Sequence, residues 1–487
     1  MRPWILLAAS VLAVFWGVLA APFHYDDYAL LLDQAIPSPS GWLECFRWEQ
    51  SRPLVWFTFW ANYQLSGASP MSWHAVNLAL HLFNALLIWT SFQALLPGRA
   101  SWFAAFFFAL HPIQTEAVAY IYARGILLAT LFCLLALRLW IAGRRWPAVA
   151  SFALALLSKE ECAAFPAFLL LLHLSTNRER GERAPIVAMF ALSLAAVGRV
   201  AWLAAAIPGS GAGAQSGVGM AEYFLTQGIS LWSYLRLLVI PTGFSFEPGL
   251  RIETGGLAFL AWAGIVALAL ISLRYFRKAG AGFWFLGALA LIAPTSSIFP
   301  AMDLAADRRV YLPMVALASA TGLLLRRTDF PRLLWAGAVV LGMLSYVRVD
   351  VWRSQEGLWE DAMRAAPEAV RPRIQLSRLR APLEALALLE EAKKIAPNDA
   401  AVASELGRVF MQIQRPGDAL NEYGRALAIE PGSAMAHNNR GVALQALGIH
   451  GHAERDFRRA LALDPCLAPA RENLWKLGLS VDTPCRR

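Results

Sequence analysis

The feature that most constrains the fold is a series of apolar runs, most of them long enough to cross a lipid bilayer. A helix needs about 20 mainly apolar residues to cross the hydrocarbon core, and somewhat fewer where a bundle buries it. Eleven such runs lie at residues 3–21, 73–96, 100–111, 116–142, 146–158, 161–176, 184–207, 257–276, 281–299, 309–326 and 331–348. The sequence therefore predicts an all-α, polytopic membrane helix bundle with eleven spans.

The distribution of charge predicts a boundary at residue 348. Residues 1–348 contain 40 of the 77 charged residues, and the 139 residues of 349–487 contain the other 37. Membrane spans exclude charge, whereas the surface of a water-soluble domain carries it. We therefore predict a membrane domain at 1–348 and a water-soluble domain at 349–487. This composition excludes a secreted disulfide scaffold, a disordered protein and a cytosolic α/β enzyme.

Basic clusters between the apolar runs predict the orientation, because cytoplasmic loops carry an excess of arginine and lysine. These clusters fall in alternate loops if the N-terminus is cytoplasmic. They are Arg99, Arg144 with Arg145, Arg178 with Arg180 and Arg183, Arg274 with Arg277 and Lys278, and Arg326 with Arg327 and Arg332. If the apolar stretch 222–241 crossed the membrane completely, Arg274, Arg277 and Lys278 would lie outside the cytoplasm. We therefore interpret this stretch as interfacial or re-entrant. Eleven crossings place residues 349–487 outside the cytoplasm, and the net charge of +9 reflects orientation rather than a nucleic-acid partner.

The C-terminal domain contains a 34-residue repeat, which is the tetratricopeptide period. The positions that follow this step are Pro397, Pro431 and Pro465; Ala392, Ala426 and Ala460; Gly407 and Gly441; and Tyr423 and Phe457. A small residue lets paired helices approach, an aromatic ring fills the gap, and proline ends the second helix. We predict a TPR α-solenoid of about three repeats, whose concave surface is of the kind that binds an extended peptide or a partner helix.

The five cysteines do not form a disulfide framework. Cys133 and Cys162 lie in apolar stretches and are predicted core thiols. Cys466 and Cys485 flank the last predicted helix and can pair if that end of the chain lies in an oxidising compartment. No spacing of cysteine and histidine indicates zinc, so we expect no metal centre of that kind.

Ionisable residues at the outer ends of the spans are candidates for function, because burying a charge at membrane depth is costly. In the predicted orientation, five loops bring such residues to one face. They are Asp26 and Asp27; Arg52; His111, Glu116 and Arg124; Lys159, Glu160 and Glu161; and Asp303, Asp307, Arg308 and Arg309.

Several of these residues also have a simpler structural interpretation. Adjacent carboxylates such as Asp26 and Asp27 act as a general base, bind a divalent cation, or are solvated surface charges. His111 alone is more typical of a helix-terminal histidine bonded to backbone. Arg124, inside an apolar span, needs an anion, which is either a lipid phosphate or a carboxylate in a buried ion pair.

The remaining charges have comparable alternatives. Arg308 and Arg309 either contribute to a phosphate site or anchor a helix to lipid headgroups. Glu160 and Glu161 are expected to pair with Lys159.

The ordered motifs of the chain resemble a known family. They are Tyr25-Asp26-Asp27, Arg52-Pro53-Leu54, the run from Trp73 to His81, the run from Ala109 to Val118, Leu157-Ser158-Lys159-Glu160, and the run from Asp307 to Pro313. Together with the C-terminal repeats, they resemble the transmembrane and tetratricopeptide-repeat (TMTC-type) O-mannosyltransferases and their bacterial relatives, of the GT-C glycosyltransferase superfamily.

The resemblance implies a GT-C-like membrane domain that takes a sugar from a polyprenyl-phosphate carrier and transfers it to a hydroxyl acceptor at the non-cytoplasmic face. By position it implies that Asp26 is the catalytic base, with Asp27 beside it. The residues that it implies for the carrier phosphate and the substrate are Arg124, His111, Glu116, Arg52, Lys159, Arg308 and Arg309. Two features depart from the family: Gly125-Ile126-Leu127 follow Arg124 where an acidic residue is common, and the repeat array is short.

The expected partners are a polyprenyl-phosphate-linked sugar such as mannose, a protein or peptide acceptor in the TPR groove, and membrane lipid, with no nucleic acid. The sequence identifies no cofactor, and a divalent cation at Asp26 and Asp27 stays an open alternative. The expected location is a bacterial inner membrane with the TPR domain in the periplasm. The alternative is a non-catalytic, membrane-anchored TPR scaffold for envelope or secretory proteins. A transporter is disfavoured because the sequence contains no inverted repeat.

Overall fold

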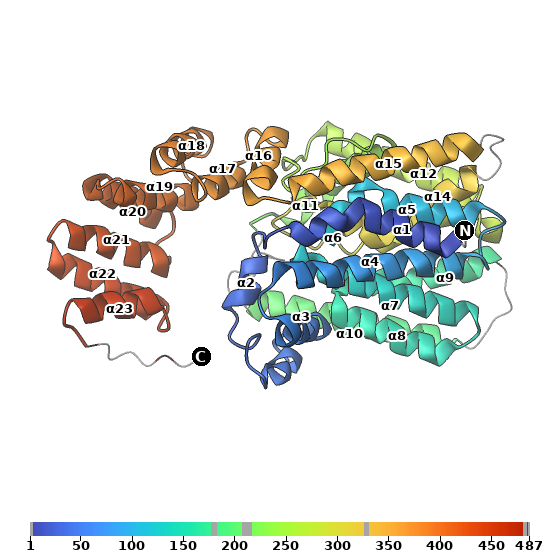
Figure 1. The fold of residues 1–487 in the computed structure, drawn as a ribbon, viewed down its shortest axis with the longest axis horizontal. Coiled ribbons are helices and arrows are strands. Elements are labelled where there is room, and N and C mark those ends of the chain that lie inside the picture. The colour runs from blue at the N-terminus through green and yellow to red at the C-terminus, as the bar shows by residue number, and fades with distance from the viewer. Residues whose placement is uncertain (1–2, 177–182, 207–216, 326–330, 481–484, 486–487) are drawn as a thin grey trace. The chain divides into compact units, whose positions relative to one another are not determined.

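The computed structural model describes residues 3–176, 183–206, 217–325, 331–480 and 485, and every element in these ranges is a helix. The chain forms two compact units, Met1–Leu358 and Trp359–Arg487 (Figure 1). Arg178, Arg180, Arg326 and Arg327 of the predicted orientation clusters lie outside the described residues. The predicted all-helical architecture is confirmed.

The helices of the N-terminal unit follow the apolar runs of the sequence. The main ones are α1 (Pro3–Phe15), α2 (Asp27–Leu32), α3 (Pro53–Ser66), α4 (Pro70–Phe92), α5 (Ala100–Leu110), α6 (Thr115–Ala119), α7 (Arg124–Ile141), α8 (Arg145–Ser158), α9 (Phe165–Thr176), α10 (Ala184–Ala206), α11 (Met220–Val239), α12 (Gly256–Leu273), α13 (Ala281–Ile292), α14 (Tyr311–Leu325) and α15 (Pro331–Val351). Short 3-10 segments include η1 (Trp16–Ala20), η2 (Gly41–Phe46), η4 (Ile121–Ala123), η5 (Glu160–Ala164) and η8 (Asp307–Val310). Each of the eleven predicted runs overlaps at least one of these α-helices.

Length and composition identify the strongest membrane spans. Within the described residues, four helical segments are long and apolar enough to cross a membrane: Pro70–Phe92, Ile121–Ile141, Ala184–Ala206 and Gly256–Leu273. Shorter apolar helices lie at Trp4–Ala20, Ala100–Leu110, Arg145–Ser158 and Ala281–Ile292. A shorter helix can still cross when neighbours bury it, so the count of eleven crossings stays a prediction.

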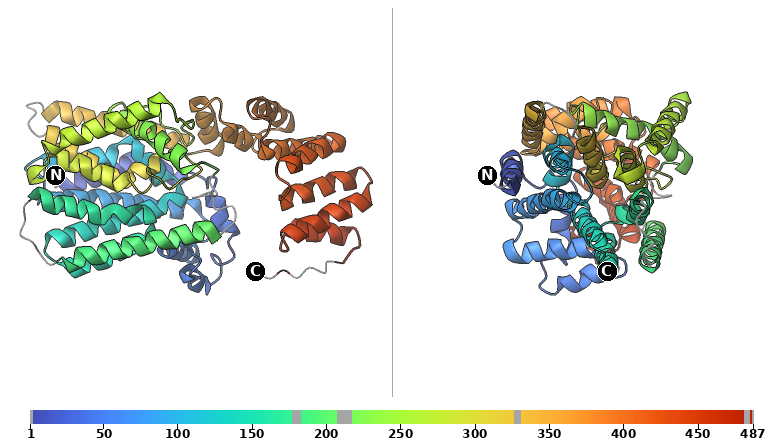
Figure 2. Two further views of the ribbon diagram at one scale, coloured as in Figure 1. Left: turned by 180° about the vertical axis from the view of Figure 1, so that it is seen from behind. Right: turned by 90° about the vertical axis from the view of Figure 1, so that its right-hand side faces the viewer.

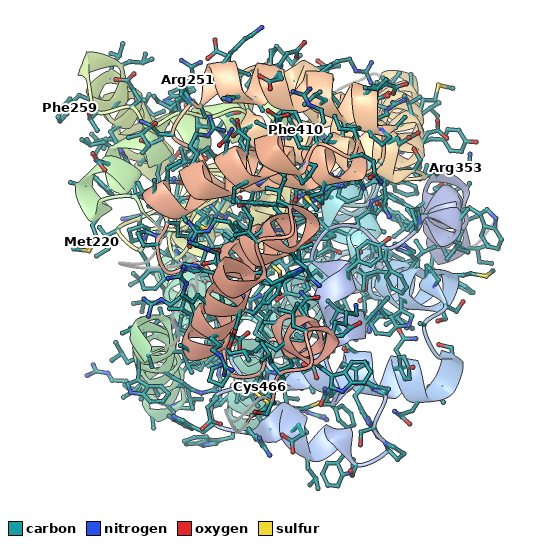
Figure 3. The ribbon with its side chains drawn as sticks, turned by 90° about the vertical axis from the view of Figure 1, so that its left-hand side faces the viewer. Met220, Arg251, Phe259, Arg353, Phe410 and Cys466 are labelled. Atoms are coloured by element: carbon teal, nitrogen blue, oxygen red, sulfur yellow. A yellow bond between two sulfur atoms is a disulfide. The ribbon has the colours of Figure 1, made fainter. Side chains whose placement is uncertain are left out.

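The bundle has a buried centre and an apolar exterior. Helices α4, α7, α8, α9 and α10 lie nearly parallel in Figures 1 and 2. Helix α14 packs so closely on α5 that a Cβ at Gly322 would lie 2.5 Å from the carbonyl oxygen of Ala100. On the outside, Leu194 of α10 and Leu260 of α12 are 74% and 69% exposed, and Phe259 beside Leu260 points outward in Figure 3. Exposed apolar side chains on the longest apolar helices fit a surface that faces lipid.

The connections between helices bring the predicted candidate residues together at one end of the bundle. Arg52, which precedes α3, pairs with Glu160 after α8, and Arg308 before α14 pairs with Glu116 of α6. Asp26, which precedes α2, bonds with Tyr120 after α6. We call this end of the N-terminal unit the site end.

Helix α11 begins and finishes at the site end. Near its start, the Tyr223 hydroxyl donates to the carbonyl of Thr295, at 2.6 Å, in the loop after α13. Near its end, the carbonyl of Leu238 lies 3.3 Å from Nε2 of His111, in the loop after α5. Because both ends contact loops of the same end of the bundle, α11 lies across that end. This arrangement agrees with the interpretation of 222–241 as interfacial or re-entrant.

The C-terminal unit is built from paired helices with the predicted repeat. They are α17 (Val370–Ser377), α18 (Pro382–Ile395), α19 (Ala400–Gln412), α20 (Pro416–Ile429), α21 (Ala434–Ala446), α22 (His450–Leu463) and α23 (Ala468–Lys476), preceded by α16 (Gln355–Ala365). A Cβ at Gly407 would lie 2.6 Å from the ring of Tyr423, and a Cβ at Gly441 would lie 2.6 Å from the ring of Phe457. The glycine of the first helix therefore gives space to the aromatic ring of the second, as the TPR period predicts.

A disulfide joins Cys466 to Cys485 across α23, with the two Cα atoms 4.8 Å apart. The other cysteines, Cys45, Cys133 and Cys162, are free and buried in the N-terminal unit. Disulfides persist in oxidising compartments and are rare in the cytosol. The bond therefore favours the orientation in which the C-terminal unit is outside the cytoplasm.

Reduction of this disulfide is expected to destabilise the C-terminal unit. A bond that closes a loop of about 15 residues contributes roughly 3 kcal/mol to the free energy of unfolding, and this loop spans 19 residues. A reductant should lower the thermal midpoint of the full chain in detergent, followed by circular dichroism. The double variant Cys466→Ser, Cys485→Ser should begin at the lower midpoint and show no response to reductant. An unchanged midpoint after complete reduction would contradict a stabilising role.

Candidate functional site

Asp26 and Asp27 lie side by side in the loop after η1, but their environments differ. Tyr25 has a φ of 42°, in the left-handed region that is uncommon for residues other than glycine. This turn sends the two following side chains to different partners. Asp27 is fully buried, whereas Asp26 is half-buried.

Both carboxylate oxygens of Asp27 are held by backbone. The N–H of His24 donates to Oδ2 at 2.9 Å, and the N–H of Tyr122 donates to Oδ1 at 2.8 Å. Burial raises the pKa of Asp27 to about 8, and the two N–H donors oppose that rise. Because both oxygens are occupied, Asp27 joins two segments of the site end. Within the described residues, no group of three or more His, Cys, Asp and Glu side chains is arranged to hold a metal ion, and the divalent cation at Asp26 and Asp27 stays a prediction.

Asp26 has one occupied carboxylate oxygen. The Tyr120 hydroxyl donates to Oδ2 at 2.7 Å and accepts from the N–H of Asp26 at 3.2 Å. Among the described residues, no side chain or backbone N–H donates to Oδ1 of Asp26, and no cation forms an ion pair with it. A half-buried carboxylate of this kind has the geometry of a general base, which must reach the proton that it removes.

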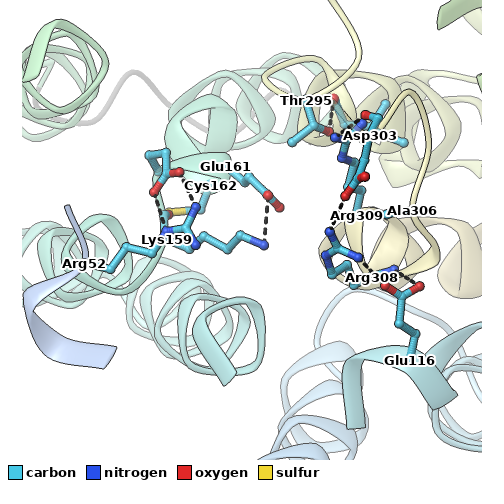
Figure 4. Close-up of polar contacts among 12 residues, drawn as sticks. Arg52, Glu116, Lys159, Glu161, Cys162, Thr295, Asp303, Ala306, Arg308 and Arg309 are labelled. Carbon is cyan, nitrogen blue, oxygen red and sulfur yellow. Dashed lines mark hydrogen bonds and ion pairs between the residues drawn. The ribbon is translucent and has the colours of Figure 1, made fainter. Parts of the chain in front are cut away.

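Two cation–carboxylate pairs lie on one side of the site end. Nε and Nη2 of Arg52 donate to the two oxygens of Glu160, at 3.1 and 2.7 Å. Burial raises the pKa of Glu160, but Arg52 outweighs it and brings the pKa to about 2. Nζ of Lys159 lies 2.8 Å from Oε1 of Glu161 (Figure 4). The expected pairing of Lys159 with glutamate is therefore found with Glu161, while Glu160 binds Arg52.

The loop before α14 supplies the cations of the other side. Nη1 of Arg308 lies 2.5 Å from Oε1 of Glu116, and Nη2 lies 3.0 Å from Oδ2 of Asp303 (Figure 4). Arg309 donates to the Tyr223 hydroxyl at 3.1 Å and to the carbonyl of Asp303 at 2.7 Å. Arg308 keeps 20% of its side chain exposed, whereas Arg309 is buried among neutral oxygens.

The two groups of charges influence one another across the site end. Lys159 interacts electrostatically with Arg52 and Arg308, and Arg309 interacts with Glu161. Tyr122 interacts electrostatically with both Arg52 and Asp26, and Tyr120 interacts with both Arg308 and Asp26, so residues far apart in the sequence form one group of charges near Asp26. Cations gathered in this way bind and stabilise an anionic group such as a phosphate.

Asp307, beside Arg308, is a buried carboxylate. Burial and the charge of Glu116 raise the pKa of Asp307 to about 8, against the opposing effect of three arginines.

Arg124 lies in the interior rather than at the surface of the site. Its guanidinium is fully buried and donates to four acceptors: Oδ1 of Asn77 at 3.0 Å, Oδ1 of Asn62 at 2.9 Å, and the carbonyls of Trp73 at 3.0 Å and Thr58 at 3.2 Å. The ring of Phe59 covers one face, 4.6 Å from the guanidinium carbon. Asp27 interacts with this charge electrostatically. These contacts favour a structural role for Arg124 over the predicted binding of a carrier phosphate.

His111 has the environment of a helix-terminal histidine bonded to backbone, which is the simpler of its two predicted environments. The side chain is fully buried, Nδ1 accepts from the N–H of Ile113 at 3.2 Å, and Nε2 lies 3.3 Å from the carbonyl of Leu238. Since both ring nitrogens contact backbone, the geometry favours the helix-terminal role over contact with a phosphate.

Sequence reasoning followed charged residues and therefore missed the uncharged ones that organise the site. Tyr120, Tyr223, Asn62 and Asn77 contact Asp26, Arg309 and Arg124. Tyr120 lies two residues after the run from Ala109 to Val118. Its position next to a motif of the resembled family was the available signal. Asn77 lies within the run from Trp73 to His81 that carries the family resemblance, but no short pattern connects it or Asn62 to Arg124, which is 47 and 62 positions away.

Comparisons with known proteins identify relatives for part of the chain. No family model matches it. It is 34% identical to protein O-mannosyl-transferase TMTC3 of Mus musculus over 145 residues, which are 27% of this chain and 16% of the relative. It is 36% identical to protein O-mannosyl-transferase TMTC2 of Homo sapiens over 150 residues, 28% of this chain and 18% of the relative. The alignments therefore span less than a fifth of the length of these relatives.

Solved structures with a similar arrangement are TPR-type proteins. MamA has a TM-score of 0.23 and 18% identity, over 26% of this chain and 78% of that chain. YrrB, described as a TPR protein with an unusual peptide-binding site, has a TM-score of 0.23 and 22% identity, over 32% of this chain and 81% of that chain. The sequence alignments confirm the resemblance that the motifs indicated: this chain is similar to the TMTC O-mannosyl-transferases.

Proposed function

We propose that this chain is a membrane glycosyltransferase that moves a sugar from a polyprenyl-phosphate carrier to a hydroxyl group of a protein or peptide. The observation that carries the proposal is the carboxylate of Asp26, which Tyr120 orients and which shares electrostatic partners with Arg52 and Arg308 of other loops. The names of the similar proteins support this reaction class and make mannose the first sugar to test.

The proposed reaction is a single displacement at the anomeric carbon of the sugar. Asp26 accepts the proton of the acceptor hydroxyl, and the acceptor oxygen forms a bond to that carbon. The bond between the carbon and the phosphate oxygen breaks, and the polyprenyl phosphate leaves with its electron pair. Cations near the leaving phosphate lower the barrier because its negative charge grows in the transition state.

Arg308 and Arg309 are the preferred residues for the carrier phosphate. Arg308 is partly exposed, and its guanidinium presents several donors in a geometry that suits phosphate. Arg309 is held by neutral oxygens, so its charge remains available to a nearby anion. Arg52 and Lys159 are proposed as further substrate contacts on the opposite side, in exchange with Glu160 and Glu161. In this proposal Arg124 and His111 hold the loops of the site end in place and do not bind the phosphate.

Orientation and domain roles form part of the proposal. Residues 1–348 act as the transferase domain, and 349–487 recruit the acceptor or a partner through the TPR groove. The disulfide of Cys466 and Cys485 supports a C-terminal unit outside the cytoplasm. The basic clusters support a cytoplasmic N-terminus, and a bacterial inner membrane with a periplasmic TPR domain is the proposed location.

Replacing Asp26 is expected to abolish most of the transfer activity. Asp26→Asn keeps the shape of the side chain but removes the base, and loss of a general base lowers a rate by about 10²–10⁴-fold. The measurement is incorporation of labelled sugar from polyprenyl-phosphate mannose into protein, in membranes that contain the full chain. Asp33→Asn is the matched control, because Asp33 follows α2 and, among the described residues, its side chain accepts one hydrogen bond, from the N–H of Ala35. Full activity in Asp26→Asn would remove Asp26 from the mechanism and favour the scaffold alternative.

Replacing Arg308 is expected to slow the chemical step. Removal of one donor that stabilises a developing negative charge typically lowers kcat by about 10²–10³-fold. Arg308→Gln should therefore reduce transfer strongly in the same membrane assay. Arg353→Gln is the control, because Arg353 is exposed and pairs with the nearby Asp350. Equal effects in both variants would indicate a general change in surface charge and contradict the assignment of Arg308.

A further inference from the structure

We propose that Tyr120 is the positioning residue for Asp26, a role that rests on the proposed transferase function. Its hydroxyl holds one carboxylate oxygen and the backbone of the same aspartate, so that the other oxygen faces the acceptor. Tyr120 does not touch the reacting atoms in this scheme. It acts by fixing the base.

The two hydrogen bonds of Tyr120 restrain Asp26 at two points. The hydroxyl donates to Oδ2 at 2.7 Å and accepts from the N–H of Asp26 at 3.2 Å. One bond fixes the rotation of the carboxylate, and the other fixes the backbone that carries it. A base held in this way loses little conformational freedom when the acceptor binds, which is the benefit of a preorganised site.

Tyr120 is itself rigidly supported. Its ring is 1% exposed and packs on Phe246 and Trp352, with ring centroids 5.4 and 6.0 Å apart. Its carbonyl accepts from Nδ2 of Asn77 at 3.1 Å, and Oδ1 of Asn77 accepts from Arg124 at 3.0 Å. Hydrogen bonds, together with the covalent structure of Asn77 and Tyr120, therefore connect the buried guanidinium of Arg124 to the carboxylate of Asp26.

Tyr120 also contacts the cation proposed for the phosphate. The guanidinium carbon of Arg308 lies 5.9 Å from the centre of the Tyr120 ring, while Arg308 pairs with Glu116 and Asp303. An ion pair between Arg308 and Asp26 would occupy both the base and the phosphate-binding cation. By bonding Asp26 and packing against Arg308, Tyr120 gives each charge a separate partner.

The test compares Tyr120→Phe with Tyr28→Phe, each of which removes one hydroxyl and keeps the ring. Tyr28 lies in α2, two residues after Asp26, but its hydroxyl bonds to Gln355. The charged or titratable groups that face Asp26 are Asp27, Tyr120 and Tyr122, and Arg308 faces Tyr120. In Tyr120→Phe we expect kcat to fall by roughly tenfold with KM for the donor unchanged, because the lost donor bonded a charged group. The acidic limb of the pH–rate profile should move to higher pH by about one unit.

A second measurement does not depend on activity. Labelling of Asp26 by a water-soluble carbodiimide, followed by mass spectrometry across pH, should have its midpoint at higher pH in Tyr120→Phe and not in Tyr28→Phe. If the unsubstituted full chain transfers no sugar, the proposed function fails, and the labelling still tests Tyr120. Superimposable labelling curves for Tyr120→Phe and the unsubstituted chain, or equal shifts in both variants, would overturn the assignment of Tyr120.

Discussion

The buried guanidinium of Arg124 is the interaction on which the site end depends. It bonds Thr58 and Asn62 of α3 and Trp73 and Asn77 of α4, so one side chain of α7 joins three helices. Hydrogen bonds to a charged group contribute about 1.5–3 kcal/mol each, which makes this set hard to replace with apolar packing. Through Asn77 the same group supports Tyr120, and through its charge it supports Asp27. The segment that carries Asp26 and Asp27 is thus stabilised by a cation that the substrate does not need to contact.

The charges around Asp26 are balanced pair by pair, and this balance suits a site that must accept and release an anion. Arg52, Lys159 and Arg308 each hold a glutamate, so none needs a ligand to remain buried or half-buried. In the proposed reaction the carrier phosphate competes with these glutamates for the same donors. Asp26 differs from these glutamates because its partner is a neutral phenol rather than a cation.

Sequence patterns predicted the features that are local or periodic and missed those that depend on distant contacts. The 34-residue period predicted the contacts of Gly407 with Tyr423 and Gly441 with Phe457, because a repeat specifies its own packing. Hydropathy located the helices of the N-terminal unit, since the apolar surface that lipid requires is visible in the sequence. The environment of Arg124 was not predictable, because its acceptors are uncharged groups on other helices. The division of roles between Asp26 and Asp27 also required the structure, because it depends on the turn at Tyr25.

The segment that carries Asp26 and Asp27 also contacts the residues that follow α15 and lead to α16. Nε2 of His24 lies 2.7 Å from the carbonyl of Trp352, whose ring packs against both His24 and Tyr120. Gln355 donates to the carbonyl of Phe23 at 3.4 Å, and the chain then continues through α16 to the repeats. A displacement of Trp352 would move His24 and the ring against Tyr120 together, and both residues fix the aspartates. The residues that orient the proposed base are therefore covalently continuous with the domain proposed to recruit the acceptor.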